Sequence, residues 1–297
     1  MHTDILPLLA CPTCRAALTV SGGLPSDSVE TGALVCAAGH EFKIVNGVPR
    51  FLGHELNDDQ ARARDSFGYE WTELYPEQRH SEAERNEERR VFLEYTRTLP
   101  SDYRGKLVLD AGCGNGRYAK FTNEWGARVV AVDMSSAVEV AARNLAGRGT
   151  VDVVQADLFR LPFRDGVFDI AYSVGVLHHT PDAAGAFQSV AKAVRPGGSF
   201  AIFVHAQGNR VLHGVNRLLR RFTSRASPKS DVAVLARADR LRQGAAADPA
   251  GRSPGRHHTP AARVLLTRPA QQFRSLQCRL HELSSSTGSS RLVPGLG

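Results

Sequence analysis

The segment from Lys106 to Arg117 constrains the fold more than any other part of the chain. An apolar run at residues 106–109 leads directly into Asp110, and glycine follows at three alternate positions, Gly112, Gly114 and Gly116. Glycine after a strand lets the backbone turn tightly and approach a ligand closely, because no Cβ blocks the contact. The segment therefore predicts a strand, a nucleotide-type binding loop and the start of a helix, with a plain turn as the alternative.

Two carboxylates end the next two apolar runs. Asp133 follows residues 127–132, about twenty residues after the glycine loop, and Asp157 follows the run at residues 151–156. An acidic side chain at the first of these places accepts hydrogen bonds from both hydroxyls of a ribose bound beside the glycine loop. Asp133 is therefore a candidate ligand-binding residue.

Two more strands complete the pattern. The apolar runs at residues 167–173 and 199–205 predict them, and the helical stretch between them is closed by Arg-Pro-Gly-Gly at residues 195–198. Strands that alternate with helices predict a parallel sheet covered on both faces. The expected fold class is α/β, with a doubly wound and mostly parallel sheet.

Residues 106–205 resemble the core of a class I S-adenosylmethionine-dependent methyltransferase. The matching segments are residues 109–116, 132–133, 156–158, 168–169, 176–179 and 195–198. The resemblance implies a Rossmann-like fold with S-adenosyl-L-methionine as cofactor, bound by Asp110, Gly112, Gly114, Gly116, Asp133, Met134, Asp157, Leu158 and Ser173. In this reading the glycine loop holds the amino-acid end of the cofactor, Asp133 the ribose, and Asp157 with Leu158 the adenine. Capping of a helix is the alternative role for Asp157.

Length, hydropathy and charge limit the other interpretations. With 297 residues the chain can bury one sizeable core and a small second unit. It has no run of about eighteen apolar residues and no opening signal stretch, which predicts a cytoplasmic protein with no membrane partner. The net charge of +7 does not predict nucleic-acid binding, because residues 1–207 hold 21 Lys and Arg against 26 Asp and Glu, a net of −5.

Three of the five cysteines lie in the first fifty residues. Cys11 and Cys14 form a Cys-x-x-Cys pair, and Cys36 with His40 forms a second pair after a loop of about twenty residues. Four such ligands suit a closed tetrahedral zinc site, which would be structural because so small a unit cannot fold on a hydrophobic core alone. The alternatives are a redox Cys-x-x-Cys and a disulfide, and the lack of a signal peptide disfavours the disulfide.

The flanking residues add a second resemblance. Residues 4–12 and 42–52 resemble the short zinc-ribbon domain that precedes some bacterial methyltransferases, including ribosomal RNA guanine methyltransferases. In those RNA enzymes Cys-x-x-Cys is paired with Cys-x-x-x-His, which implies His40 as the fourth ligand here. Many other relatives have a second Cys-x-x-Cys instead, so an exposed His40 with water or another group on the metal is the alternative.

A charged segment with an aromatic cluster lies between the ribbon and the core. Residues 82–90 predict a solvated helix face with ion pairs one turn apart. The aromatic cluster at residues 67–75 contains Tyr69 and Trp71, which are candidate cofactor-binding residues if the cluster forms a lid over a sulfonium cation. Packing that docks a linker is the alternative.

The chain after the fifth strand departs from the methyltransferase pattern. Residues 211–222 predict an amphipathic helix, and residues 263–267 are the best candidate for a further strand. The composition beyond the helix is rich in Ala, Arg, Ser, Pro and Gly, which predicts that residues 224–297 are largely disordered. The edge of the fifth strand would then stay unpaired, and proteases would cut after about Arg225. A basic tail for anionic partners is the alternative.

These segments divide the chain into four parts. A zinc ribbon at residues 1–53 precedes a helical linker and lid at residues 54–100. The methyltransferase core at residues 101–223 has an incomplete sheet closure, and a basic tail follows at residues 224–297.

The acceptor side of the core is expected just after the fourth strand. His178 and His179 lie there and are candidates for orienting or deprotonating an acceptor, because histidine titrates near neutral pH. Anchoring of a helix start is the alternative. The stretch Gly-Val-Leu-His-His at residues 175–179 resembles the small-molecule branch of the family.

The first hypothesis for function is therefore methyl transfer to a small-molecule acceptor. The second is an RNA base methyltransferase whose zinc ribbon contacts RNA. The third is a non-catalytic remnant with an interaction-type ribbon, which the incomplete sheet closure favours.

Overall fold

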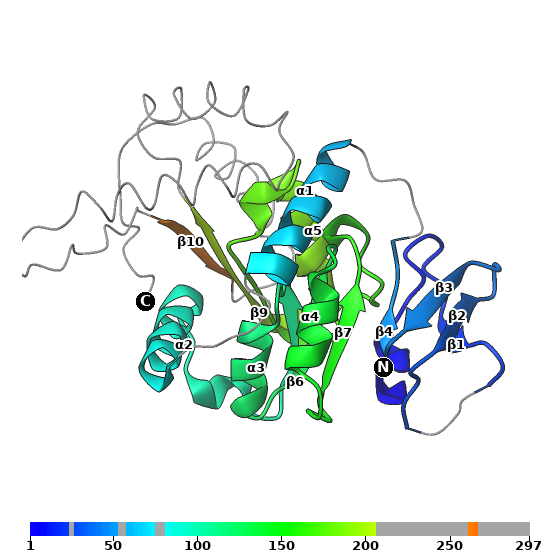
Figure 1. Cartoon of the computed structure of the whole chain (residues 1–297), viewed down its shortest axis with the longest axis horizontal. Coiled ribbons are helices and arrows are strands. Elements are labelled where there is room, and N and C mark those ends of the chain that lie inside the picture. The colour runs from blue at the N-terminus through cyan, green and yellow to red at the C-terminus, as the bar shows by residue number, and fades with distance from the viewer. Residues whose placement is uncertain (24–26, 53–57, 75–80, 206–260, 267–297) are drawn as a thin grey trace, which may run out of the picture.

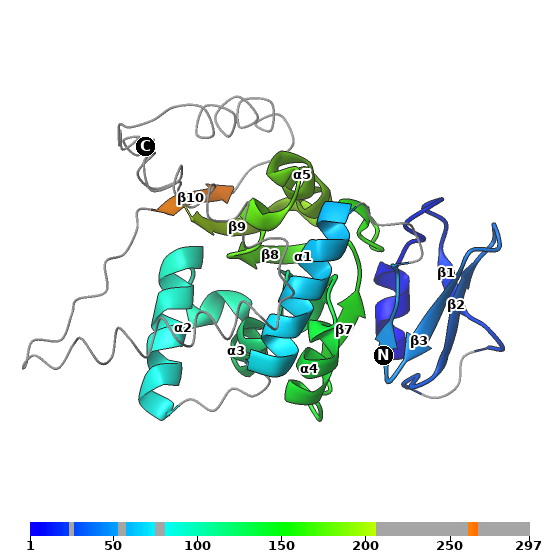
Figure 2. The same cartoon turned by 45° about the horizontal axis from the view of Figure 1, so that its top comes forward.

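The chain folds into a small antiparallel sheet beside a larger α/β unit (Figure 1). The computed structural model describes residues 1–23, 27–52, 58–74, 81–205 and 261–266. The N-terminal unit is blue and lies next to strand β7 of the larger sheet (Figures 1 and 2).

The N-terminal unit consists of a short 3-10 helix and four strands. These are η1 (Thr3–Leu8), β1 (Leu18–Val20), β2 (Gly32–Cys36), β3 (Glu41–Val45) and β4 (Val48–Pro49), and the strands pair in chain order. Buried and exposed residues alternate along β3, as in a sheet with one covered face. Asn46 and Gly47 both have positive φ, which matches the tight turn between β3 and β4.

Two helices lead from this unit to the larger sheet. They are α1 (Asp58–Tyr69), which continues into the π-helical turn η2 (Glu70–Leu74), and α2 (Glu82–Thr96). Ser81 starts α2 with a reciprocal cap: its hydroxyl accepts from the Glu84 N–H, and the Glu84 carboxylate accepts from the Ser81 N–H. Arg90 pairs with carboxylates one turn away on either side, so the predicted ion-paired helix face is confirmed.

The larger sheet has the strand order β10-β9-β8-β5-β6-β7. Its strands are β5 (Leu107–Ala111), β6 (Arg128–Asp133), β7 (Val151–Gln155), β8 (Phe168–Val174), β9 (Val194–His205) and β10 (Ala261–Leu266). Neighbouring strands are parallel except for β9 and β10, which are antiparallel. The predicted doubly wound, mostly parallel sheet is therefore confirmed.

Helices cover both faces of this sheet (Figure 1). The remaining helices are η3 (Pro100–Tyr103), α3 (Arg117–Glu124), α4 (Ala137–Asn144), η4 (Leu158–Arg160), η5 (Leu177–His179) and α5 (Ala183–Ala193). Successive residues of β5 point to opposite faces, so Val108 packs with α2, α3 and α4, whereas Leu109 packs with α5. Both side chains are fully buried.

Strand β9 corrects two expectations. It starts at Val194, so residues 195–198 lie inside the strand rather than at the end of the preceding helix, and the register with β8 shifts there. The expectation that its edge stays unpaired is wrong, because β10 pairs with residues 200–205 along their whole length. The run Ala-Ala-Arg-Val-Leu-Leu of β10 is apolar and partly β-branched, which is enough to pair with an apolar edge. The other residues of the predicted tail, and the helix predicted at residues 211–222, lie outside the described residues.

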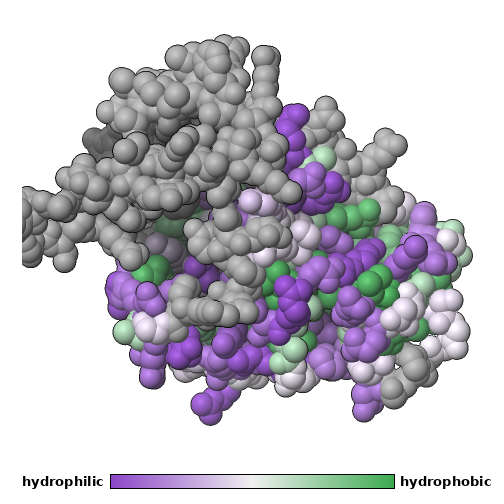
Figure 3. Space-filling model, in the orientation of Figure 1, coloured by the Kyte–Doolittle hydropathy of each residue, from purple (hydrophilic) through white to green (hydrophobic). Residues whose placement is uncertain are grey.

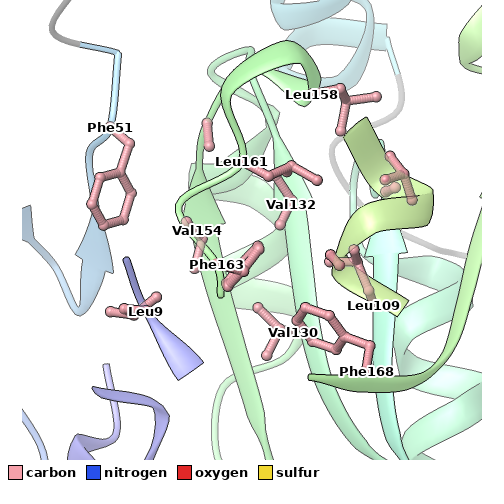
Figure 4. Close-up of a cluster of buried hydrophobic side chains, with 14 of the residues drawn as sticks. Leu9, Phe51, Leu109, Val130, Val132, Val154, Leu158, Leu161, Phe163 and Phe168 are labelled. Atoms are coloured by element: carbon pink, nitrogen blue, oxygen red, sulfur yellow. The ribbon is translucent and has the colours of Figure 1, made fainter. Parts of the chain in front are cut away.

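One hydrophobic cluster is shared by the N-terminal unit and the larger sheet. Leu9 and Phe51 of the first unit lie opposite Val154 and Phe163 of the second (Figure 4), and none of the four is more than 2% exposed. The backbones are joined as well, because Leu9 forms an antiparallel bridge with Phe163. The two units therefore pack as one hydrophobic core on this side of the sheet.

The visible face of the described residues is mostly hydrophilic, with apolar residues scattered over it (Figure 3). Among the described residues, no helix is both long enough and apolar enough to cross a membrane.

Candidate functional site

A pocket lies where strands β5, β6, β7 and β8 end. It encloses about 950 Å³, its open mouth included. Open parallel sheets bind their ligands at this end, because the loops after the strands diverge there. The predicted site residues that line it are Trp71, Gly112, Gly114, Asp133, Met134, Asp157, Leu158 and His179. Tyr69, Asp110, Gly116, Ser173 and His178 were also predicted, and they do not line it.

The glycine loop forms the floor of the pocket. Gly112 and Gly114 have φ of 91° and 52°, a region that side chains with a Cβ rarely adopt. A Cβ on Gly112 would come within 2.4 Å of the Val176 side chain, and one on Gly114 within 2.9 Å of the Trp71 ring. Backbone conformation and space both require glycine at these two positions.

Gly116, the third glycine of the loop, lies at the start of α3 and does not line the pocket. It has φ of 83° and forms the N-cap of α3, and a Cβ there would come within 2.8 Å of Leu145. Glycine at this position permits the tight turn into α3 and the close packing of the loop against Leu145, which follows α4.

Asp133 ends β6 beside the glycine loop. Its Oδ2 accepts a hydrogen bond from the Gly114 N–H at 3.0 Å, and its Oδ1 accepts from the Ser135 N–H at 2.8 Å and the Ser135 hydroxyl at 2.7 Å. A carboxylate offers about four acceptor positions. Among the described residues Oδ1 accepts two hydrogen bonds and Oδ2 one, so Oδ2 is the oxygen that can accept a further bond from a ligand hydroxyl.

Asp157 and Leu158 line the pocket after β7, and Met134 lines it after β6. The carboxylate of Asp157 also caps η4 by accepting from the Phe159 N–H at 3.0 Å. The two roles considered for Asp157 are therefore compatible, because the cap fixes the side chain at the pocket wall.

Asp110 and Ser173 lie beneath the pocket rather than in it. Ser173 is fully buried and donates to the Ala111 carbonyl at 2.7 Å, which ties β8 to β5. Asp110 is 2% exposed, and its Oδ2 has no hydrogen-bond partner within the described part of the chain. Burial raises the pKa of Asp110 to about 8, despite hydrogen bonding from Tyr172 that acts to lower it.

The aromatic cluster contributes to the pocket through one helix face. Phe67 and Trp71 both line it, whereas Tyr69 does not. Residues four apart lie on the same side of a helix, and a residue midway between them points elsewhere. Helical spacing would have selected Phe67 in place of Tyr69.

Only one of the two predicted histidines lines the pocket. His179, at the end of η5, packs edge-on against Phe67 with ring centroids 5.0 Å apart. The His178 ring lies 4.0 Å from that of His179, tilted by 42°, and His178 does not line the pocket. If either histidine acts on an acceptor, the geometry favours His179.

Several lining residues were not predicted, among them Arg117, Tyr118, Phe159, Thr180 and Pro181. Most of them directly follow a motif residue, and that adjacency is the signal that could have identified them. Arg117 is the one cation among the lining residues that the structure describes, and its guanidinium donates to Glu88 at 3.2 Å.

The four predicted metal ligands come together in the N-terminal unit. The ligand atoms of Cys11, Cys14, Cys36 and His40 all lie within 4.8 Å of one another. The Cys14 and Cys36 sulfurs are 3.6 Å apart, and His40 Nδ1 is 3.6 Å from the Cys11 sulfur. Tetrahedral zinc with Zn–S bonds of about 2.3 Å places neighbouring ligand atoms roughly 3.5–3.8 Å apart. Two of the separations fall in this range, the Cys36 sulfur lies closer to His40 Nδ1, at 3.2 Å, and three thiols with one imidazole are a donor set that suits zinc.

Two tight turns present these ligands. The Arg15 N–H donates to the Cys11 carbonyl, with Arg15 at φ of 63°, and the Gly39 N–H donates to the Cys36 carbonyl, with Gly39 at φ of 82°. Burial acts to raise the pKa of the Cys36 thiol, but hydrogen bonds from the His40 side chain and backbone lower it to about 6. The three cysteines are free thiols, so the disulfide alternative does not apply here.

The fold and the pocket define a class of protein. The family model described as "Methyltransferase domain" matches residues 109–202, which run from the end of β5 into β9. The chain therefore carries a class I S-adenosylmethionine-dependent methyltransferase domain.

Individual relatives share this domain with the chain. It is 32% identical over 122 residues to cycloartenol-C-24-methyltransferase 1 of Oryza sativa subsp. japonica, covering 37% of this chain and 35% of the relative. It is 37% identical over 111 residues to probable tRNA methyltransferase 9B of Mus musculus, covering 36% and 24%. A solved S-adenosylmethionine dependent methyltransferase from Mesorhizobium loti is 33% identical, with a TM-score of 0.33, covering 36% of this chain and 49% of that chain. The chain thus spans about a third or less of the length of these two curated relatives.

Proposed function

We propose that this protein transfers a methyl group from S-adenosyl-L-methionine to a small-molecule acceptor. The observation that carries the proposal is the convergence of Gly114, Asp133 and Asp157 on one pocket at the carboxyl ends of adjacent parallel strands. These three residues are far apart in the chain, and only the sheet brings them together.

The residues of the pocket fit the donor along its length. The backbone at Gly112 and Gly114 gives the amino-acid end close access, and the Arg117 cation suits its carboxylate. Asp133 has one acceptor position left for a ribose hydroxyl, and Asp157 with Leu158 lines the adenine side. When bound, the donor supplies a methyl group activated by a sulfonium cation.

Two aromatic side chains of the pocket suit that cation. Phe67 and Trp71 present rings to the space above the glycine loop, where a positive charge is attracted to the ring faces. They also restrict the access of water, so the reaction depends mainly on the alignment of donor and acceptor. His179 and Thr180 are the polar side chains near the expected acceptor position, and we assign them its orientation.

A small acceptor is favoured by the lining and the charge. Val174, Val176, Phe159 and Pro181 make that side of the pocket apolar. Residues 1–207 carry a net charge of −5, which does not favour a polyanion such as RNA. The rice relative is named as a methyltransferase of a small molecule, cycloartenol.

RNA base methylation is the second candidate. It is favoured by the mouse relative, which is named as a probable tRNA methyltransferase, and by the resemblance of the N-terminal unit to ribbons that precede ribosomal RNA methyltransferases. In this alternative the ribbon contacts the RNA.

One experiment separates the candidates. Purified protein and donor labelled in the methyl group are incubated with an RNA-free metabolite extract and, in parallel, with total RNA. Label in a small molecule supports the first proposal, and label in RNA supports the second. Donor titration by calorimetry is the companion measurement, because a non-catalytic remnant with a failed pocket would not bind the donor.

A further inference from the structure

The end of the N-terminal unit touches the larger sheet directly behind the donor pocket. Arg50 follows β4 and forms a parallel bridge with Gln155, the last residue of β7. The next residue, Phe51, donates its N–H to the Gln155 carbonyl at 2.8 Å. The chain leaving the ribbon therefore extends the sheet by one short pairing at the edge strand β7, which leads into the predicted donor loop that contains Asp157.

The Arg50 side chain is held between two partners on the larger unit. Its Nη2 donates to the Glu139 carboxylate on α4 at 2.5 Å, and its Nη1 donates to the Gln155 Oε1 at 3.4 Å. The Arg50 side chain is 16% exposed, so the ion pair is partly shielded from solvent. Glu139 thereby fixes the guanidinium against Gln155.

The other end of the Gln155 amide holds the loop after β6. Its Nε2 donates to the carbonyls of Met134 and Ser135, each at 3.3 Å. An amide has one acceptor end and one donor end. Because Arg50 can only donate, it selects the rotamer in which the Gln155 oxygen faces the ribbon and the nitrogen faces the loop.

That loop positions the donor-binding carboxylate. Ser135 donates twice to Asp133 Oδ1, through its N–H and its hydroxyl, and Met134 lines the pocket. The contacts form a continuous series from Arg50 through Gln155 to the Met134–Ser135 backbone and on to Asp133. Each step is a hydrogen bond within the described residues.

The ribbon holds the neighbouring donor loop in the same way. The Arg15 guanidinium donates to the carbonyls of Leu161 at 3.1 Å and Phe163 at 2.6 Å, in the segment that follows Asp157 and Leu158. The ribbon therefore contacts the segment after Leu158 directly, through Arg15, and reaches the loop after Asp133 through Gln155.

We propose that Arg50 is a positioning residue for the donor site, through which the N-terminal ribbon sets the affinity for S-adenosyl-L-methionine. This inference rests on the proposed function, since it concerns the same pocket. Arg50 lies outside the pocket and acts through Gln155, so it orders the loop that Asp133 needs without contacting the donor.

The test compares donor affinity by calorimetry in the full chain. Arg50→Met keeps the aliphatic stem and removes the three side-chain hydrogen bonds, to Gln155, to Glu139 and to the Val45 carbonyl within the ribbon. It is expected to raise the Kd of S-adenosyl-L-methionine roughly three- to tenfold. Gln155→Leu should have the same effect, and the double variant should be no worse than either alone, because both changes break one series of contacts. Arg50→Lys keeps the charge and one donor and should fall between Arg50→Met and the unaltered chain.

Lys43→Met is the matched control. Lys43 is an exposed residue of β3 in the same ribbon, so this variant removes the same charge without touching Gln155. It should leave the Kd unchanged. Amide hydrogen exchange in the ligand-free protein gives a second readout: the segment 134–139 should exchange faster in Arg50→Met than in Lys43→Met, while the melting temperatures of the two variants stay close.

The outcomes separate this inference from the proposed function. If the unaltered chain binds no donor, the proposed function fails and the inference fails with it. If the unaltered chain binds and Arg50→Met has the same Kd as Lys43→Met, the inference alone is overturned. Additive losses in the double variant would also overturn it, because the two residues would then act independently.

Discussion

The N-terminal unit and the larger sheet differ in what can stabilise them. Strands of the first unit are two to five residues long, and the unit holds a cluster of three cysteines and one histidine that could bind a metal. Strands of the second are five to twelve residues long and lie between two hydrophobic clusters. A unit as small as the first needs a metal to supplement its core, whereas the second can fold on burial alone.

The comparison also shows where the two units depend on each other. The cluster that contains Leu9 and Phe51 of the first unit continues into Val154 and Phe163 of the second (Figure 4). If the two units were independent, loss of the metal would unfold the first unit and leave the second intact. The shared cluster instead predicts that the second unit loses stability too, because part of its core would face water.

The largest expected effect is that of metal loss. We expect one zinc per chain, and Cys36→Ser should remove it and unfold the N-terminal unit, since zinc contributes about 10–16 kcal/mol of binding free energy in small zinc-dependent folds. The larger unit should melt at a lower temperature as its share of the cluster is exposed. Metal analysis and circular dichroism melting measure both effects.

Glu41→Gln, an exposed change in the same ribbon, serves as the control and should keep zinc and stability. Protein purified without chelator that contains no zinc would refute the metal site. An unchanged melting temperature of the larger unit in Cys36→Ser would refute the dependence between the units.

The second prediction concerns the pocket floor in the larger unit. Gly114→Val should abolish donor binding, because a β-branched residue is strained at φ of 52° and its Cβ would displace the Trp71 ring. Gly147→Val is the matched control: Gly147 also has positive φ, 76°, but nothing lies within 4 Å of its Cβ position. Calorimetric binding that survives in Gly114→Val as well as in the control would show that the donor binds elsewhere.

A smaller loss is expected at the ribose carboxylate. Asp133→Ala should weaken donor binding by about 1.5–3 kcal/mol, because it removes an acceptor for the ligand and the anchor of Ser135. Asp27→Ala, an exposed change in the ribbon, should leave affinity as it is. Equal Kd values for the two variants in a calorimetric titration would remove Asp133 from the site.

The smallest effect concerns pH and the buried Asp110. Its pKa is raised by burial from 3.8 to about 8, so the folded chain keeps a proton that the unfolded chain releases. The stabilisation from this proton is complete below pH 4 and is lost as the pH rises through about 8. The side chain in Asp110→Asn stays neutral at every pH, so this variant does not lose stability in the way that the unaltered chain does. The free energy of unfolding of the variant minus that of the unaltered chain should therefore increase by about 1.4 kcal/mol or less from pH 6 to pH 7.

Denaturant titrations of both proteins across pH 5–9, without donor, measure this difference. A difference that does not change with pH would mean that Asp110 is ionised in the folded chain.

The sequence predicted the parts of the site that depend on local patterns. A strand that runs into Gly112 and Gly114, and a carboxylate such as Asp133 at the end of the next strand, are both visible in a few consecutive residues. The same holds for the metal ligands, since two pairs with short internal spacing each form one tight turn.

Other parts of the site and the fold depend on the direction of a side chain or on contacts between distant segments. Ser173 and Asp110 flank the motifs, but the alternation of β8 and β5 points them away from the pocket. Tyr69 and Trp71 were both chosen from the aromatic cluster, but the residues of that cluster that line the pocket are Phe67 and Trp71. The pairing of β10 with β9 joins segments more than fifty residues apart, for which weak local composition gave little signal.

By itself, then, the sequence determined the order of strands and helices, and it predicted the loops that line the pocket and the Cys and His residues that cluster, because each is encoded by neighbours along the chain. Only the tertiary structure decided how the two units meet. Arg50 reads as an ordinary surface cation in the sequence, and it becomes a bridge to Gln155 only because β4 lies against the edge of β7. Contacts between distant segments depend on the packing of the shared cluster, which no local pattern specifies.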